Sequence, residues 1–514
     1  MANRAVEIAP AATLGLAVAA LILGSAAMVA ARAETWVLNP SDWAALRFTV
    51  LQAALSAGLS TLLAVPVARA LHRRRFRGRD GLIRLMAAPF VLPVVVAVLG
   101  LLAVFGRGGP LNSGLMAVGL PPVSIFGLHG IVLAHIFLNL PLAVRMILHG
   151  WSAIPTERFR LAASLGMPQS ALFRHLEWPM LRALVPGAAA MIFLICLTSF
   201  AVALTLGGGP KSSTIELAIY QSLRFEFDLG RAALLAALQF GLCALVTLAS
   251  LRLTVPQAFG AGLDRASAAL SVGGWRQWAD GIVIIAAALF LLAPLLAVVR
   301  AGLPGLLHLP DAVWPAAARS VGISVASAVL ATAAALTLAQ AAARPGGGWF
   351  DLAAMLPLSA SSLVLGTGLF LAVRPFASPE NLSVSITILV NTTLSLPFLF
   401  RLLLPEARQL RAGYAQLSGS LGLTGLVQLR FVTLPRLARP LGFGAGLAAA
   451  LSMGDLGVIA LFAGDRGATL PLVVQRLMGA YRMEDAAAAA LVLVALSFAL
   501  FWAFDRIGHH YADA

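Results

Sequence analysis

Charged residues are scarce in this 514-residue chain. Asp, Glu, Lys and Arg together make up 11% of it, whereas hydrophobic residues make up 60% and the mean hydropathy is +0.91. So little polar surface cannot cover a water-soluble globule of this size. The scarcity excludes a soluble protein and predicts a chain that is embedded in a lipid bilayer.

Cysteine and the usual reactive constellations are also nearly absent. The two cysteines, Cys196 and Cys243, fall within apolar stretches and have no metal-ligand spacing, so we expect them to be packing residues. The sequence has no catalytic triad, no paired carboxylates in a soluble domain and no zinc motif. We therefore expect neither an enzyme nor a bound metal or cofactor.

Lysine occurs once, at Lys211, after three glycines and Pro210. A nucleotide-binding loop requires G-x-x-x-x-G-K-[ST], in which backbone N–H groups hold the phosphates. Proline at the position of the final glycine removes one of these N–H groups. The chain therefore has no ATP-binding loop of its own.

The basic residues do not indicate a nucleic-acid partner, although the formal net charge is +15. Most lie in loops between apolar stretches, and the densest run holds Arg73, Arg74, Arg75, Arg77 and Arg79. Basic residues favour the cytoplasmic side of a membrane, and with a cytoplasmic N-terminus most of them fall on that side. This pattern predicts that both termini are cytoplasmic.

Apolar stretches of about 20 residues, long enough to cross the hydrocarbon core, occur about twelve times. We expect the spans near residues 11–33, 48–70, 82–105, 126–149, 181–204, 230–253, 279–300, 316–342, 351–374, 383–406, 439–462 and 485–505. Ala31-Arg32-Ala33 could be read as a signal-peptide cleavage site, but the preceding apolar run is long for one, so an uncleaved first span is favoured.

Two polar segments in this apolar chain repeat each other. RLAASLGMPQSALFRHLEWP ends at Pro179, QLSGSLGLTGLVQLRFVTLP ends at Pro435, and their Leu-Gly pairs end at Gly166 and Gly422. The separation between Gly166 and Gly422 equals the separation between Pro179 and Pro435. We call this separation along the chain the repeat spacing. The repeat predicts two parallel six-span halves, residues 1–253 and 281–514, joined by a cytoplasmic linker at 254–280.

Each repeated segment has the pattern of a short surface helix between two spans. Glycine allows two helices to meet at an angle, and proline suits the first turn of the next helix. Such a helix could dock into a groove of another protein, or it could lie on lipid headgroups. Two copies in register favour docking, through loops 150–178 and 406–434.

These residues resemble the cytoplasmic loop of permease subunits from binding-protein-dependent ABC importers. The matching positions are Ala162, Ala163, Gly166, Leu176 and Pro179 in the first copy and Gly422, Val432, Leu434 and Pro435 in the second. The family's opening glutamate is replaced by Arg160 and Gln416, and its second alanine by Ser418 in the second copy. The stretches LGGGPKSSTIELAIYQSLRFEFDLG, FLNLPLAVR and SMGDLGVIALF resemble, more closely, fused thiamine permease subunits.

The resemblance implies an all-α integral membrane protein with the ABC importer permease fold, in a bacterial inner membrane. It implies transport of thiamine or its phosphate esters, with ferric iron or another small solute as the alternative. The implied partners are two copies of a cytoplasmic ATPase, which binds ATP and Mg, and a periplasmic solute-binding protein. A secondary transporter driven by an ion gradient is the rival class, but no coupling acids are evident in both halves.

A few polar residues within the spans are candidates for the transport pathway. Asp455 is the clearest, because an unpaired acid in a membrane is costly and is retained mainly for function. It could instead pair with an arginine or cap a broken helix, which Gly454 and Gly457 would allow. Ser199 stands one repeat spacing before Asp455, and Asn139 is the third candidate.

The loop after the fifth span carries the acids Glu216, Glu226 and Asp228. A solvated acidic loop is the favoured interpretation, and a docking site for the binding protein is the alternative.

Overall fold

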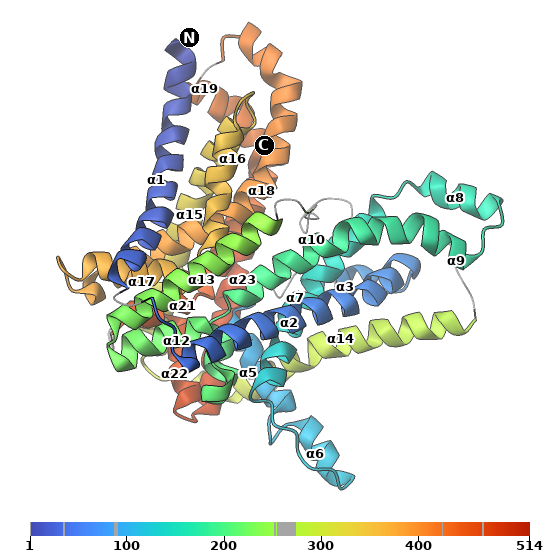
Figure 1. Cartoon of the computed structure of the whole chain (residues 1–514). Coiled ribbons are helices and arrows are strands. Elements are labelled where there is room, and N and C mark those ends of the chain that lie inside the picture. The colour runs from blue at the N-terminus through green and yellow to red at the C-terminus, as the bar shows by residue number, and fades with distance from the viewer. Residues whose placement is uncertain are drawn as a thin grey trace.

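The computed structural model of the chain describes residues 2–513 except 34–35, 87–90, 251–252, 254–273, 424 and 465–466. Within these ranges every regular element is helical (Figure 1). Most of the expected linker at 254–280 lies outside the described residues. Helix α14 begins at Trp275, so the last residues of that expected linker belong to a helix instead.

The helices of the first half are α1 (Ala2–Arg32), α2 (Pro40–Arg73), α3 (Arg79–Leu85), α5 (Val94–Phe105), α6 (Pro110–Ala117), α7 (Leu128–Ser152), α8 (Thr156–Ser164), α9 (Gln169–Leu172), α10 (Trp178–Leu197), α11 (Ala201–Leu206), α12 (Ile215–Gln221) and α13 (Leu229–Ser250). Those of the second half are α14 (Trp275–Gly302), α15 (Val313–Ala342), α16 (Gly348–Met355), α17 (Ser362–Val373), α18 (Ser383–Ser420), α19 (Gly425–Gln428), α20 (Leu434–Met453), α21 (Gly457–Phe462), α22 (Leu470–Gly479) and α23 (Met483–Asp513).

The described residues form eleven segments that are long and apolar enough to cross a membrane, and the bent pair Gly348–Ser359 and Ser362–Val373 would make a twelfth. This agrees with the number of spans expected from the sequence. Helices are the natural form for such segments, because hydrocarbon offers no partner for a free backbone N–H or C=O. The chain is therefore an all-α, multi-pass membrane protein.

The helices form two arms that diverge from a shared base (Figure 1). One arm ends at α8 and α9 and the other at α19, whereas α12 and α22 lie in the base. The first helix of each half packs against helices of the other half. Helix α1 contacts α15, α16 and α17, and α14 contacts α2 and α5. This exchange ties the two halves together.

Several helices of the two halves correspond at the repeat spacing. The first and last residues of α10 and of α20 are related by it, and so are those of α11 and α21. A single π-helical turn precedes each long helix, at Phe173–Glu177 and at Leu429–Thr433, again at this spacing. The local backbone therefore repeats along with the sequence motif.

Two expected spans, 181–204 and 439–462, are broken rather than continuous. In the first, α10 ends at Leu197 and α11 begins at Ala201, and in the second α20 ends at Met453 and α21 begins at Gly457. Hydropathy alone missed these breaks, because the side chains around each one are mostly apolar.

Two further expected spans, 82–105 and 351–374, are also interrupted. Helix α3 ends at Leu85 and α5 begins only after Pro93, which has no N–H to donate. The other span bends by 90° between Ser359 and Ser362. Ser361 caps the outgoing helix α17 by accepting a bond from the Val364 N–H at 3.0 Å.

Buried glutamines satisfy the carbonyl groups that the break after α10 leaves free. Gln52 Nε2 on α2 donates to the Cys196 carbonyl at 2.9 Å, and Gln239 Nε2 on α13 donates to the Leu197 carbonyl at 2.9 Å. Both glutamine side chains are fully buried. An unpaired carbonyl at this depth would be costly, so these two side chains allow the helix to end there.

Replacing Gln52 by leucine tests this account of the break. We expect Gln52→Leu to lower the free energy of unfolding by about 1–3 kcal/mol, because it leaves the Cys196 carbonyl without a donor. The exposed Gln221 has no such role, so Gln221→Leu is the matched control. Thermal unfolding of the purified protein in detergent is the measurement, and equal midpoints for the two variants would contradict the account.

Candidate translocation site and loop surfaces

A cavity of about 330 Å³ lies between the two halves, at the level of the broken helices. Its walls come from α7, α10 and α11 of the first half and from α18, α20 and α21 of the second, with the starts of α5 and α17 completing them. The polar residues that line it are His135, Asn139, Thr198, Ser199, Ser362 and Asp455. The structure thus brings together all three pathway candidates from the sequence.

On the first-half side, a hydrogen-bonded group surrounds His135. Its Nδ1 lies 3.1 Å from Ser56 Oγ and its Nε2 lies 2.9 Å from Ser199 Oγ. Asn139 Nδ2 donates to the His135 carbonyl at 2.9 Å. Both ring nitrogens are therefore engaged by hydroxyl groups, and Ser199 is held at the cavity wall.

On the second-half side, Asp455 stands in the break between α20 and α21. Its Oδ1 accepts the Gly457 N–H at 3.2 Å, and its Oδ2 is enclosed without a hydrogen-bond partner. Asp455 therefore caps a broken helix, as the sequence allowed, and it also lines the cavity. The described residues contain no ion pair of Asp455 with an arginine.

Sequence reasoning missed three polar residues of the cavity wall, His135, Thr198 and Ser362. A signal for His135 was available, because it is a polar residue in the middle of the apolar fourth span and precedes Asn391 by one repeat spacing. Asn391 donates to Ser452 Oγ at 2.9 Å, so both positions hold a buried hydrogen bond. Ser362 gave no signal, because only the bend before α17 brings it to the cavity.

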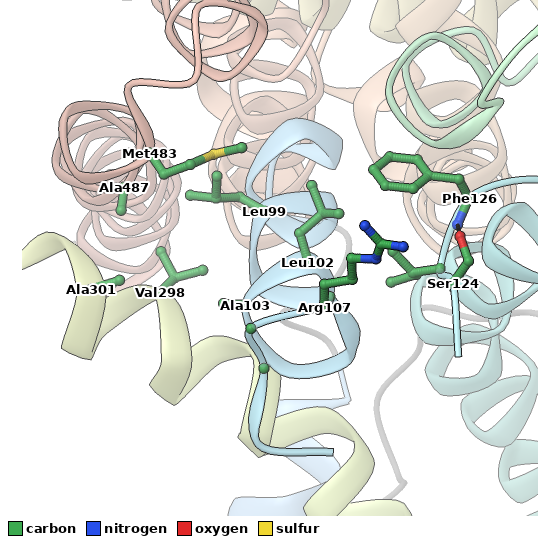
Figure 2. Close-up of a pocket in the computed structure, with 14 residues that line it drawn as sticks. Leu99, Leu102, Ala103, Arg107, Ser124, Phe126, Val298, Ala301, Met483 and Ala487 are labelled. Carbon is green, nitrogen blue, oxygen red and sulfur yellow. Dashed lines mark hydrogen bonds between the residues drawn. The ribbon is translucent and has the colours of Figure 1, made fainter. Parts of the chain in front are cut away.

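A second cavity, of about 510 Å³, lies among α5, α14 and α23 (Figure 2). Leu99, Val298 and Met483 are among its mostly apolar lining residues, while Arg107 reaches between α5 and the segment that carries Ser124 (Figure 2). None of the pathway candidates lines it. The smaller polar cavity is therefore the better candidate for a solute path.

The acidic loop after the fifth span differs from the solvated loop that the sequence favoured. Glu216 is fully buried, on α12. Glu226 is exposed and accepts a bond from Arg231 Nη1 at 2.9 Å, and Arg231 also pairs with the buried Asp42 at 2.9 Å. The interpretation as a solvated acidic loop is thus wrong for Glu216.

At the arm tips, the two glycines of the repeated motif have the same left-handed backbone, with φ of +62° at Gly166 and +65° at Gly422. Each ends a helix in the same way. In the first copy, the Gly166 N–H bonds to the Ala163 carbonyl at 3.1 Å and the Met167 N–H to the Ala162 carbonyl at 3.0 Å. This is a Schellman motif, for which glycine is the preferred residue.

The second copy repeats this cap but not the separate short helix that we expected. The Gly422 N–H bonds to the Gly419 carbonyl at 3.2 Å and the Leu423 N–H to the Ser418 carbonyl at 2.9 Å. Here, however, α18 runs unbroken from Ser383 to Ser420, through Pro405. Loop 406–434 is thus largely an extension of a span, whereas α8 of the first loop is a separate helix.

The remaining motif residues lie where each loop re-enters the helical arm. Pro179 and Pro435 stand in the first turn of α10 and α20, as the motif predicted. Leu176 and Val432 lie in the two π-helical turns, and Leu434 begins α20.

Ion pairs also hold the end of the first loop against α2. Glu177, which is almost fully buried, forms ion pairs with Arg69 Nη2 at 2.7 Å and Arg73 Nη2 at 3.2 Å, both on α2. The second loop has the uncharged Thr433 at the equivalent position.

Each arm tip exposes an equivalent pair of leucines. Leu161 and Leu165 are 60% and 68% exposed. Leu417 and Leu421, at the equivalent positions of the second copy, are 53% and 63% exposed. Exposed apolar side chains gathered in this way are typical of a surface that contacts another protein or a membrane.

Comparisons with known proteins agree with this picture, although no protein-family model matches the chain. It is 39% identical to the thiamine transport system permease protein ThiP of Salmonella typhimurium, with 96% of each chain covered. It is 33% identical to the ThiP protein of Haemophilus influenzae, over 91% of this chain and 88% of that protein. The molybdenum transport system permease protein ModB of Mycobacterium bovis is 33% identical over 41% of this chain and 81% of its own length.

The helical fold, the polar cavity between broken spans and these relatives define an ABC-type membrane permease. The particular group follows from identities of 33–39% over nearly the full length of both chains. The chain belongs to the family of thiamine transport system permease proteins, and the resemblance noted in the sequence is confirmed.

Cysteine labelling tests whether the cavity admits solutes. Ser199→Cys places a thiol on the cavity wall, so we expect a small methanethiosulfonate reagent to label it. Cys196 and Cys243 are fully buried, so the unaltered protein should stay unlabelled. Val202→Cys, at a fully buried position on α11, is the matched control. An unreactive Ser199→Cys would contradict the assignment of this cavity to a solute path.

Proposed function

We propose that the chain is the permease of an ATP-driven importer that carries thiamine, its phosphate esters or both across a bacterial inner membrane. The names of the relatives suggest the substrate, and the cavity between the halves offers a path. The observation that carries the proposal is the polar cavity bounded by two equivalent helix breaks, because breaks at membrane depth are tolerated where they are buried in protein or line a cavity.

In this proposal the chain is a fusion of two permease units. The elements that recur at the repeat spacing support it. The match to ModB supports it as well, because most of that single permease chain aligns with 41% of this one. Parallel halves related by an axis along the membrane normal would place both repeated loops on the same side.

The arm tips would be the docking surfaces for two copies of a cytoplasmic ATPase, which binds ATP and Mg. Equivalent glycine caps and exposed leucine pairs at the two tips support a partner that binds twice in the same way. Both termini would then be cytoplasmic, in agreement with the distribution of arginine. A periplasmic solute-binding protein would deliver the solute at the opposite side, where α12 and α22 lie.

Coupling would pass through the loops into the broken spans. Closure of the two ATPases on ATP would draw the arm tips together, and α10 and α20 lead directly from the loops to the helix breaks. A change in the angle between the arms would then open the cavity to alternate sides.

The double variant Gly166→Asp with Gly422→Asp tests the docking surfaces. Asp adds a strained residue and a charge at each apolar tip, so we expect co-purification of the ATPase and thiamine uptake to fall about ten-fold or more. Gly81→Asp is the control, because Gly81 lies on α3, outside both loops, and has open space around it. Normal assembly and uptake in the double variant would contradict the proposal.

A further inference from the structure

We propose that the Asp455 carboxylate is the counter-ion of the positively charged thiazolium ring of thiamine as the solute passes through the cavity. This inference rests on the proposed function, in which the cavity is the solute path. It adds the part of the substrate that the permease recognises and the residue that recognises it.

The charges of the cavity wall favour a cation. Among the residues that line the cavity, Asp455 is the one carboxylate, and no lysine or arginine is present. His135 has both ring nitrogens engaged by Ser56 and Ser199. A buried negative charge without a basic neighbour is costly unless a cation comes to it.

Capping alone does not account for a charged residue at this position. The bond from the Gly457 N–H occupies only Oδ1, and a neutral Asn or Ser could accept the same bond. At the equivalent break in the first half stands the neutral Ser199. Oδ2 of Asp455 is enclosed without a hydrogen-bond partner, so the protein leaves part of this carboxylate uncompensated.

The remaining walls suit a flat heteroaromatic cation. Phe200 and Phe398 line the same cavity, and aromatic faces attract cations. The hydroxyl groups of Thr198, Ser199 and Ser362 can serve the polar substituents of the solute. The volume of about 330 Å³ lies in the range of small-molecule sites.

A substitution at Ser362 can move the negative charge to another position on the cavity wall. Ser362 and Asp455 both line the cavity, and both side chains lie close to Gly457. Ser362 is the first residue of α17, where a negative charge suits the helix dipole. An aspartate at this position would restore a carboxylate to the same end of the cavity.

The experiment measures ATP-driven uptake of labelled thiamine by the complete transporter in proteoliposomes. We expect Asp455→Asn to lower uptake about ten-fold or more, because it keeps the helix cap but removes the charge. The ATPase should co-purify with the Asp455→Asn chain as it does with the unaltered chain, which reports intact assembly.

Moving the carboxylate from Asp455 to position 362 distinguishes recognition of the solute's charge from a structural role of Asp455. Asp455→Asn combined with Ser362→Asp should recover most of the uptake, whereas the size-matched pair Asp455→Asn with Ser362→Asn should not. Uptake at the normal rate in Asp455→Asn would overturn the inference. Equal recovery by both double variants would also overturn it, since charge would then not matter. If the unaltered transporter shows no ATP-driven thiamine uptake, the proposed function fails instead.

Discussion

The constraint on which this structure depends is that backbone polar groups within a membrane must find partners inside the protein. Most of the expected spans meet it as simple helices, but α10 and α20 stop short, at Leu197 and Met453. Gln52 and Gln239 satisfy the carbonyls freed by the first break. Breaks therefore occur where polar side chains are gathered, and the cavity that holds Ser199 and Asp455 is a consequence of this arrangement.

Around the helix breaks the two halves have matching local backbone but different side-chain chemistry. Their helix breaks, π-helical turns and glycine caps recur at one spacing, whereas the side chains that face the cavity differ. One side presents the hydrogen-bonded group around His135 and Ser199, and the other presents the carboxylate of Asp455. A solute with one charged end would therefore meet different chemistry on the two sides of the cavity.

Much of this could be predicted from the sequence. Apolar length gives the number of spans, and the Gly and Pro spacing locates both loops, because these residues have distinctive backbone requirements. The breaks at residues 198–200 and 454–456 could not be located by hydropathy, since it does not register where a helix stops. The burial of Glu216 and the arrival of Ser362 at the cavity depend on contacts between segments far apart in the chain. The continuity of α18 could not be predicted either, because proline usually interrupts a helix, whereas Pro405 lies within this one.

The central claim is that this chain moves thiamine by the work of a separate ATPase. The most direct measurement is uptake of labelled thiamine into membrane vesicles that contain the chain, the matching ATPase and the binding protein, with ATP compared against a proton or sodium gradient. The account predicts uptake that requires ATP and is lost without the binding protein. Uptake driven by a gradient, with this chain alone in the vesicle, would contradict it.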